Sequence, residues 1–467
     1  MVAYTVNDRL EFKHLTGALV VQVPHVNRDI VLDYIMVRSS TSPLSGTGTV
    51  DVNAENPQVV FDSDTTHTVV MYFDRCPVTI ANSESPKSIM IPIAPTTGDD
   101  HKFTVTVCAH SQYTPLEFFF FNKESNAGNL LRNEVAVAPV HVDEFTSTDI
   151  PLVGSGTQAS PYLIQIKGDY KNFLKFLAND KGRDKWYTLV KDIDFGGDTV
   201  MAVVQEFGFH GKFDGDGKHL TNAAVIGGTY GTNHYISLFP AITGGWVRNL
   251  SLSNVRLIAP TSGNFVDVYV GGFCSSLASY SENIILENIQ VSNIDFGNPL
   301  SGFSVSNRVA IGGLLGYSTK YNNGGGVSLV ACHFSQSRYN EFPIWITCTS
   351  MLFGGLIGYA NNMGVSIANC QVNFGGSQGE TGTEVSITNS CPYVGAAIGC
   401  STSSVQIVNS LLIEGNIQFV GNPFDYVKKV IGKSSSVSGQ GYINTTNLFF
   451  WKKSGENGTP IQVNDDF

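Results

Sequence analysis

Two stretches of the chain are nearly the same: IGGLLGYSTKYNNGGGVSLVACHF at residues 311–334 and FGGLIGYANNMGVSIANCQV at residues 353–372. Related stretches begin at Val270 and Val394, so the four copies start 41, 42 and 41 residues apart. Weaker copies flank these four on both sides. A fixed period in this range indicates a repeat architecture, in which each unit buries its apolar edge against the next.

Apolar residues inside each copy recur mainly with a period of two, which is the period of a β-strand. In one copy they are Ile284, Leu286, Ile289 and Val291, and the next copies repeat these offsets. The step of three in the middle predicts a bend between two short strands that keeps the same face inward. Stacked units of this kind predict a parallel β-helix. Because strands are short, we expect each repeat to form roughly two coils.

One residue of the bend is an asparagine in five copies and Ala331 in another. Asparagine adopts the left-handed αL conformation more readily than other residues that carry a side chain. Its amide can also hydrogen-bond to the equivalent amide one coil away. The sequence therefore predicts a structural ladder at one corner, made of Asn249, Asn288, Asn369, Asn409 and Asn447.

Pairs of glycines recur at the turn near the start of three copies. We expect these positions to need either a positive φ angle or a close approach of the backbone. They do not predict a phosphate-binding loop, because neither a helix nor a Lys-Ser/Thr pair follows them. The predicted turn residues are Gly271, Gly272, Gly312, Gly313, Gly354 and Gly355.

Two tyrosines, Tyr317 and Tyr359, occupy the same position in neighbouring copies. They could form an exposed aromatic stripe that stacks on sugar rings, which would make them a glycan-binding site. They could equally form a ladder of buried rings. The sequence leaves both alternatives open.

Aspartates are the candidates for catalysis, because enzymes that cleave polysaccharides use paired carboxylates. Asp192 and Asp194 lie two residues apart in KDIDF, and Asp214 and Asp216 lie in FDGDG. Short turns also favour Asp and Gly, and no acidic residue recurs in register through the repeats. We therefore expect turns rather than a catalytic or calcium site, and we predict no catalytic residue, no metal and no cofactor.

The division of the chain follows from where the repeats begin. Earlier residues show strand-like runs separated by turn residues, which predict an antiparallel β-sandwich or jelly roll. The run EFFFFN at residues 117–122 is too apolar for a strand with one wet face, so it predicts a core strand or a docking edge. The predicted parts are a sandwich at 1–140, a linker at 141–153, a β-helix opening module at 154–235, repeats at 236–451 and a tail at 452–467.

The opening module contains a helical pattern. Tyr170, Phe173, Leu174 and Leu177 fall on one helical face, and Asp169 stands near its start as the expected cap. An open end of a β-helix exposes unpaired strands. We therefore expect this short helix to cap the N-terminal end of the β-helix.

The repeats resemble those of proteins that carry the GLUG motif. IGGLLGYS and FGGLIGYA match this motif well, and the segments GSGTQASPYLIQIKGDYKNFLKF and GKFDGDGKHLTN resemble the module that precedes such repeats in bacterial surface proteins. The resemblance covers about residues 154–451 and implies a right-handed parallel β-helix. It implies little about function, since such repeats are mostly stalks and spacers.

Composition excludes several classes of partner. The formal net charge is −11 and Lys and Arg do not cluster, so nucleic acid is not an expected partner. No apolar run reaches 18 residues, so we expect no membrane insertion. The eight cysteines include no CxxC pair, so we expect buried, reduced thiols rather than a zinc site.

Three classes of function remain. The first is a structural protein of a virion, such as a phage or virus fibre, spike or head decoration, held through residues 1–140 to other virion proteins. In this case the β-helix points outward to a host-surface glycan, and the protein forms a homo-oligomer. This hypothesis, with assembly in the host cytoplasm, rests on a start without signal-peptide features. The second is a cell-surface adhesin, and the third a polysaccharide-degrading β-helix enzyme.

Overall fold

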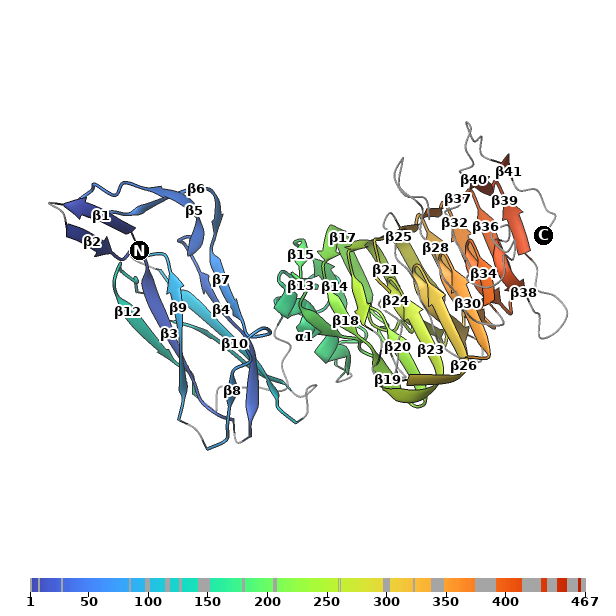
Figure 1. Cartoon of the computed structure of the whole chain (residues 1–467), viewed down its shortest axis with the longest axis horizontal. Helices are drawn as coiled ribbons and strands as arrows, with labels where there is room; N and C mark the ends of the chain where they lie inside the picture. The colour runs from blue at the N-terminus through green and yellow to red at the C-terminus, as the bar shows by residue number, and fades with distance from the viewer. Residues whose placement is uncertain are drawn as a thin grey trace. The chain divides into compact units, whose positions relative to one another are not determined.

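The computed structural model divides into two compact units, Met1–Pro151 and Leu152–Phe467 (Figure 1). It describes the chain except for residues 1, 7–8, 27, 84, 97–100, 114–117, 126–127, 142–151, 179–180, 205–207, 259, 261, 297–302, 322–323, 337–347, 374–391, 414–429, 435–442, 452–460 and 463–467. Most of the predicted linker and of the predicted tail therefore lies outside the described residues.

Two sheets form the body of the first unit. The larger sheet is antiparallel, in the order β11 (Phe118–Glu124), β10 (Phe103–Ser111), β4 (Ile30–Ser39) and β7 (Thr68–Tyr72), with β8 (Thr79–Ile80) beside β4. The smaller sheet has the order β12 (Val135–Pro139), β3 (Gly17–Val23) and β9 (Lys87–Ile93). Its β3–β9 pair is antiparallel and its β12–β3 pair is parallel. Two hairpins complete the unit: β1 (Val2–Val6) with β2 (Arg9–Lys13), and β5 (Ser45–Val50) with β6 (Val59–Thr66).

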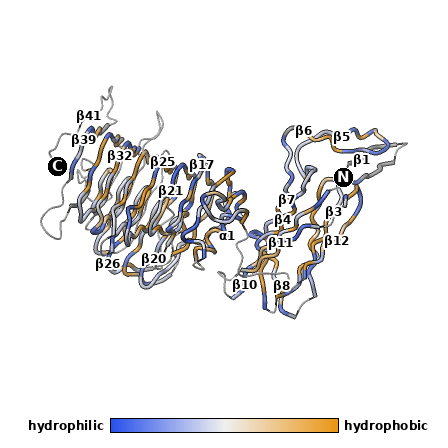
Figure 2. The backbone as a smooth tube through the Cα atoms, turned by 180° about the vertical axis from the view of Figure 1, so that it is seen from behind, coloured by the Kyte–Doolittle hydropathy of each residue, from blue (hydrophilic) through white to orange (hydrophobic). Residues whose placement is uncertain are grey.

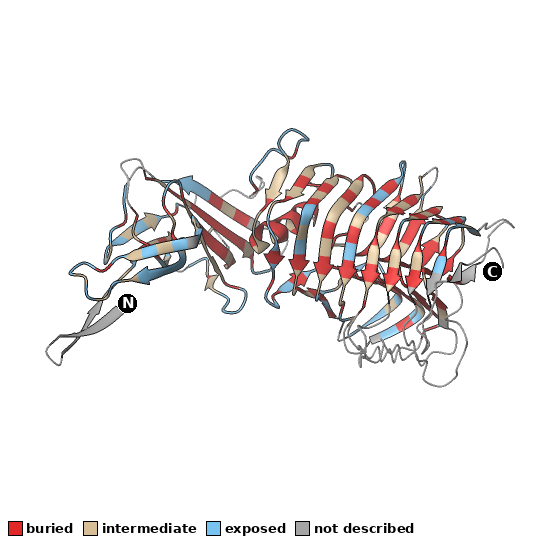
Figure 3. Cartoon of the chain, turned by 90° about the horizontal axis from the view of Figure 1, so that it is seen from above, coloured by how far each residue is buried: buried red, intermediate tan, exposed pale blue. Residues whose placement is uncertain are grey.

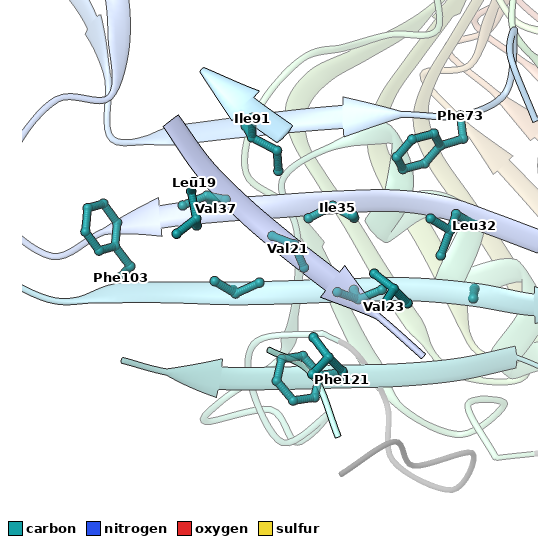
Figure 4. Close-up of a cluster of buried hydrophobic side chains, with 14 of the residues drawn as sticks. Leu19, Val21, Val23, Leu32, Ile35, Val37, Phe73, Ile91, Phe103 and Phe121 are labelled. Atoms are coloured by element: carbon teal, nitrogen blue, oxygen red, sulfur yellow. The ribbon is translucent and has the colours of Figure 1, made fainter. Parts of the chain in front are cut away.

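The core of this unit lies between the two sheets. Leu19 and Val21 of β3 pack in one cluster with Ile35 and Val37 of β4 and with Phe121 of β11 (Figure 4). Alternate residues of each strand point inward, as a pleated strand requires. These two sheets confirm the sandwich that the sequence predicts, with one parallel pair added to it.

The second unit is a parallel β-helix, which confirms the predicted fold class. Its longest sheet begins with β13 (Tyr162–Ile164), β14 (Trp186–Leu189), β17 (Lys212–Thr221), β21 (Trp246–Ser253) and β25 (Ile284–Ser292). In later coils the corresponding strand divides at the bend, into β28 (Val327–Val330) and β29 (His333–Ser335), β32 (Val365–Ala368) and β33 (Gln371–Asn373), β36 (Val405–Val408) and β37 (Leu411–Ile413), then β39 (Ile443–Thr446) and β40 (Phe449–Trp451).

Three further sheets close the coils. The first contains β20 (Asn233–Ile236), β23 (Gly263–Gly271), β26 (Phe303–Gly312), β30 (Ser350–Gly354) and β34 (Pro392–Gly395), preceded by the antiparallel β19 (Gly228–Tyr230). The second contains β24 (Cys274–Ser279), β27 (Leu315–Lys320), β31 (Ile357–Asn361), β35 (Ile398–Ser401) and β38 (Ile431–Ser434). The third contains β16 (Thr199–Met201), β18 (Ala224–Ile226) and β22 (Arg256–Ile258). The short strands β15 (Ile193–Asp194) and β41 (Ile461–Gln462) pair with β17 and β40.

Each repeat forms one coil, so the expectation of two coils was wrong. Val270 pairs with Ile311, Ile311 with Phe353, and Phe353 with Val394, which are equivalent residues of successive copies. The reason is that a single coil uses long strands. β23 has 9 residues and β26 has 10, and the coil that begins with β25, like the next two, has strands in three sheets.

The helix α1 (Lys167–Ala178) lies at the N-terminal end of the stack (Figure 1). Phe173 is fully buried, and its ring centroid is 4.7 Å from that of Tyr187 and 5.5 Å from that of Phe213. Asp169 is not the first cap residue but lies inside the first turn. Its Oδ2 accepts hydrogen bonds from the backbone N of Gln165 and of Ile166 at 2.9 and 3.2 Å, which is the role of the third helical residue in a capping box.

Buried and more exposed residues alternate along the β-helix strands (Figure 3). The described cysteines are free thiols, and all of them except Cys76 are buried. Cys332 and Cys370 lie in successive coils, where the backbone N of Cys332 is 3.4 Å from the Cys370 Sγ. Burial raises the pKa of the Cys332 thiol, which leaves it an unreactive packing residue. Cys391 lies outside the described residues.

Candidate functional site

The predicted asparagine ladder lies at one corner of the β-helix. The φ angles of its five asparagines run from 49° to 56°, and Ala331 has φ 51°. Side-chain bonds join Asn288 Nδ2 to Asn249 Oδ1 at 3.1 Å and Asn447 Nδ2 to Asn409 Oδ1 at 2.9 Å. Asn369 stands between these pairs, next to Ala331, which has no amide to offer. The backbone conformation is therefore common to all copies, whereas the side-chain ladder consists of two separate pairs.

A second asparagine corner lies five residues further along the first coils. Asn222, Asn254 and Asn293 have φ angles of 58°, 53° and 53°. In the next coil Gln336 bonds to the backbone of Ile294 through both its amide atoms, at 2.9 and 3.0 Å. We did not predict this corner from the sequence. Its signal was an asparagine after Ser or Thr, at a fixed distance from the first corner.

The paired glycines serve the close approach of backbone segments. Gly271, Gly312 and Gly354 have no positive φ angle. A Cβ atom on Gly312 would lie 1.9 Å from the Leu315 carbonyl oxygen, and one on Gly313 would lie 2.1 Å from that of Gly355 in the next coil. No side chain fits at such distances. These turns are therefore structural, and nothing in their geometry cradles a ligand.

Tyr317 and Tyr359 belong to a ladder of rings packed on one another. The centroid of Tyr317 is 4.4 Å from that of Tyr269 and 5.6 Å from that of Tyr359. Tyr359 is only 8% exposed, and the Arg308 guanidinium lies 4.8 Å from its ring centroid. A ring covered in this way offers no open face to a sugar. The geometry favours the packing alternative over glycan stacking.

The aspartates hold turns. Asp194 Oδ1 accepts hydrogen bonds from Asn222 Nδ2 and from the backbone N of Gly196, both at 2.8 Å. These bonds hold the pKa of Asp194 below its usual range, whereas a general acid needs a raised pKa. Asp214 binds Arg248 Nη2 at 2.7 Å, and its Oδ1 accepts from the backbone N of Asp216. Among the described residues, no group of three His, Cys, Asp or Glu side chains could hold a metal ion.

A groove runs across the coils between the two asparagine corners and encloses about 480 Å³. Strands of the longest sheet form its floor, and two rows of outward side chains line it. The amide–imidazole row consists of register partners in successive coils: His219, Ser251, Gln290, His333 and Gln371. The hydroxyl row, named for its three serines, lies two residues further along each strand. It consists of Ser253, Ser292, Ser335 and Asn373.

The lining of this groove is polar but carries no Asp, Glu, Lys or Arg. The side chains of Ser292, His333 and Gln371 make no hydrogen bond to another described residue, so their donors and acceptors face the groove. Partial burial lowers the pKa of His333. A neutral imidazole offers one donor and one acceptor, so His333 adds an uncharged hydrogen-bonding group beside Ser292 and Gln371.

The first unit carries an exposed apolar face, on the outer side of its smaller sheet. We define the apolar face as Ala18, Val20, Met90, Val135 and Val137, which pair in register across β3, β9 and β12. Met90, Val135 and Val137 are 59%, 56% and 55% exposed. Hydrophobic residues follow β3 and β12 along their length (Figure 2). A strand that is apolar at both alternating positions is typical of a sheet covered on both faces.

Two phenylalanines of the run EFFFFN lie in the core, as predicted for a core strand, while the strand that carries them, β11, is an edge strand of its sheet; its use as a docking edge stays a prediction. Phe119 and Phe121 point into the sandwich core, where they are 8% and 3% exposed. The exposed apolar surface lies on the other sheet. Its signal was present in GALVVQV, KSIMIPI and VAVAP, three runs whose apolar residues occupy inward and outward positions alike.

Comparison with known proteins adds little. No family model matches the sequence, so the resemblance to GLUG-motif proteins stays a prediction, and no curated protein matches it. Among solved structures, one match is an IgA1 protease, with a TM-score of 0.29 and 11% identity. That match covers 97% of this chain, and the chain spans 31% of the other protein's length. Similarity this weak carries no argument about function.

No helix among the described residues is long and apolar enough to cross a membrane.

Proposed function

We propose that the protein is a non-enzymatic structural attachment protein on the surface of a particle, in the first place a phage or virus fibre, spike or head decoration. The sandwich unit is the anchor and the β-helix is the arm that the anchor presents. The apolar face of the sandwich is the observation that carries this proposal. Contiguous exposed apolar surface on a soluble chain marks a site of interaction.

The β-helix supports the role of an arm. Its strands pair with the coil before and the coil after, so it needs no partner along its length. Its N-terminal end is filled by α1 and Phe173. The outward side chains of the groove are polar, as expected of a surface that stays in water.

The partner of the apolar face is another protein of the same particle, with an apolar and uncharged surface. None of the five residues of the face is charged, and the burial of an unpaired charge opposite them would be costly. A second copy of this chain would satisfy the same chemistry. In that case the purified protein would dimerise through this face, which the same variants would reveal.

The experiment places a charge in the apolar face. Val137→Glu should leave the fold intact, because the side chain is exposed, but should abolish incorporation into particles. Val60→Glu is the matched control, since Val60 is 67% exposed in β6 of the same unit and outside the face. Circular dichroism checks folding of both variants. Equal incorporation of the two variants would contradict the anchor assignment.

The kind of particle is decided by fractionation. Quantitative mass spectrometry of purified virions and of host cell envelopes should find the protein enriched with capsid or tail proteins. Enrichment in envelopes would instead identify the cell-surface adhesin, which would use the same division between anchor and arm.

A further inference from the structure

We infer that the groove between the two asparagine corners binds an uncharged, extended oligosaccharide that runs along the axis of the β-helix. This inference rests on the proposed function, because it names the ligand of the arm. It does not depend on Tyr317 and Tyr359, whose rings are packed on one another.

The spacing of the groove suits a chain ligand. Successive coils repeat at the strand separation of a sheet, roughly 4.8 Å. Four successive coils each contribute one residue of the amide–imidazole row and one of the hydroxyl row, so polar groups recur along the axis. A polymer of similar units can make similar contacts in each coil. Gln290, His333 and Gln371, which lie in register in three successive coils, would provide such contacts.

The chemistry of the lining selects hydroxyl groups. Ser, Gln, Asn and neutral His both donate and accept hydrogen bonds, as sugar hydroxyls do. The side chains of Ser292, His333 and Gln371 have no described partner, so a ligand would satisfy groups that only water otherwise reaches. Because the lining carries no Lys or Arg, it offers an anionic glycan no strong ion pair, and the formal net charge of −11 repels one.

An extended peptide fits the groove less well. Peptides that bind to sheets pair through their backbone with a free strand edge. The strands that form this floor have partners on both sides, as β25 has with β21 and with β28 and β29. The floor therefore presents side chains but no free backbone edge.

The test uses the full-length protein and isothermal titration calorimetry with neutral hexasaccharides: cellohexaose, maltohexaose, mannohexaose and xylohexaose. Hexagalacturonate is the anionic probe and a neutral hexapeptide the peptide probe. We expect at least one neutral sugar to bind and neither other probe to do so. Loss of the two amides in Gln290→Ala/Gln371→Ala should weaken binding roughly tenfold or more, since each lost hydrogen bond contributes about 0.5–1.5 kcal/mol.

A blocking variant separates the groove from the rest of the surface. Ser292→Trp would fill the hydroxyl row and should abolish binding. Ser328→Trp is the matched control, because Ser328 points outward from β28 on the neighbouring face and does not line the groove. Thermal melting checks the fold of both variants. Absence of binding by all neutral sugars up to about 10 mM, binding that survives Ser292→Trp, or preference for the peptide or the anionic probe would each overturn the inference.

Sugar binding in the groove does not depend on the apolar face of the sandwich. Ser292→Trp should join particles at the normal level, since it leaves the apolar face unchanged. A protein that binds sugar in the groove but joins no particle would disprove the attachment role and leave the groove assignment intact.

Discussion

The β-helix and the sandwich treat their outward strand positions in opposite ways. In the groove of the β-helix the outward residues are Ser, Gln, His and Asn, and only the inward ones are apolar. In the sheet β12–β3–β9 of the sandwich, both sets are mainly apolar, and Gln22 and Ser88 are the polar residues at outward positions. Each Å² of apolar surface removed from water contributes about 25 cal/mol of favourable free energy. The exposed apolar residues of the isolated sandwich do not make this contribution. This contrast is the basis of the proposal that the sandwich faces a partner and the β-helix faces solvent.

The largest effect is expected from the inside of the β-helix. Phe173→Ala removes a fully buried ring that packs against Tyr187 and Phe213 at the end of the stack. Loss of such a side chain costs about 3–5 kcal/mol. Urea unfolding should show this loss, whereas Phe449→Ala, at a position that is 37% exposed, should cost far less. Equal losses would mean that α1 does not close the core.

The stacking of coils gives the next largest effect. Gly312→Ala would place a Cβ atom 1.9 Å from the Leu315 carbonyl oxygen, and overpacking of this kind costs about 3 kcal/mol. In Gly364→Ala the nearest atom is Ser404 Oγ at 3.7 Å, so this variant should be neutral or slightly stabilising. The difference between the two unfolding midpoints measures how strictly the coils constrain each other. Two equal midpoints would show that the turn relaxes.

A gain in stability is expected where the ladder is interrupted. Ala331→Asn puts an asparagine at a bend residue that lies between two asparagine positions of the ladder and holds the αL conformation, with φ 51°. The new amide would lie between those of Asn288 and Asn369, and the variant should be about 1 kcal/mol more stable. A lower free energy of unfolding would contradict the conformational account of the asparagine corner.

The smallest effect on stability is expected on the apolar face. Val137→Ser changes a side chain that is 55% exposed, and such changes usually lie within about 0.5 kcal/mol of neutral. The same variant should still weaken incorporation into particles. A loss of several kcal/mol in the purified protein would mean that Val137 supports the sandwich itself, and the contrast between the two units would disappear.

The sequence predicts local features of the β-helix well, because each of them depends on the type of residue at a given position. Period-two apolar residues report which side chains point inward, and asparagine at the bend reports a positive φ. Periodicity does not report which strands become neighbours. One coil of 41 residues and two coils of half that length share the same inward pattern, which is why the coil count was wrong.

Surfaces made by several strands were beyond the sequence analysis for a related reason. The groove joins Gln290, His333 and Gln371, which lie in three coils and are not all of one residue type. The apolar face joins residues of β3, β9 and β12, which are far apart in the chain and meet only through strand pairing. In both cases the sequence shows which residues point outward, but it does not show which residues lie beside them in the folded protein.

Methionine oxidation tests the central claim most directly, because the described part of each unit carries one largely exposed methionine. Met90 lies in the apolar face and is 59% exposed, and Met201 lies in β16 of the β-helix and is 55% exposed. Peroxide converts exposed methionine to its sulfoxide, so the free protein should be oxidised at similar rates at both residues. In assembled particles we expect Met90 to be protected while Met201 still reacts. Oxidation of Met90 as fast as Met201 in the particle would show that the apolar face stays uncovered and would contradict its role as the anchor.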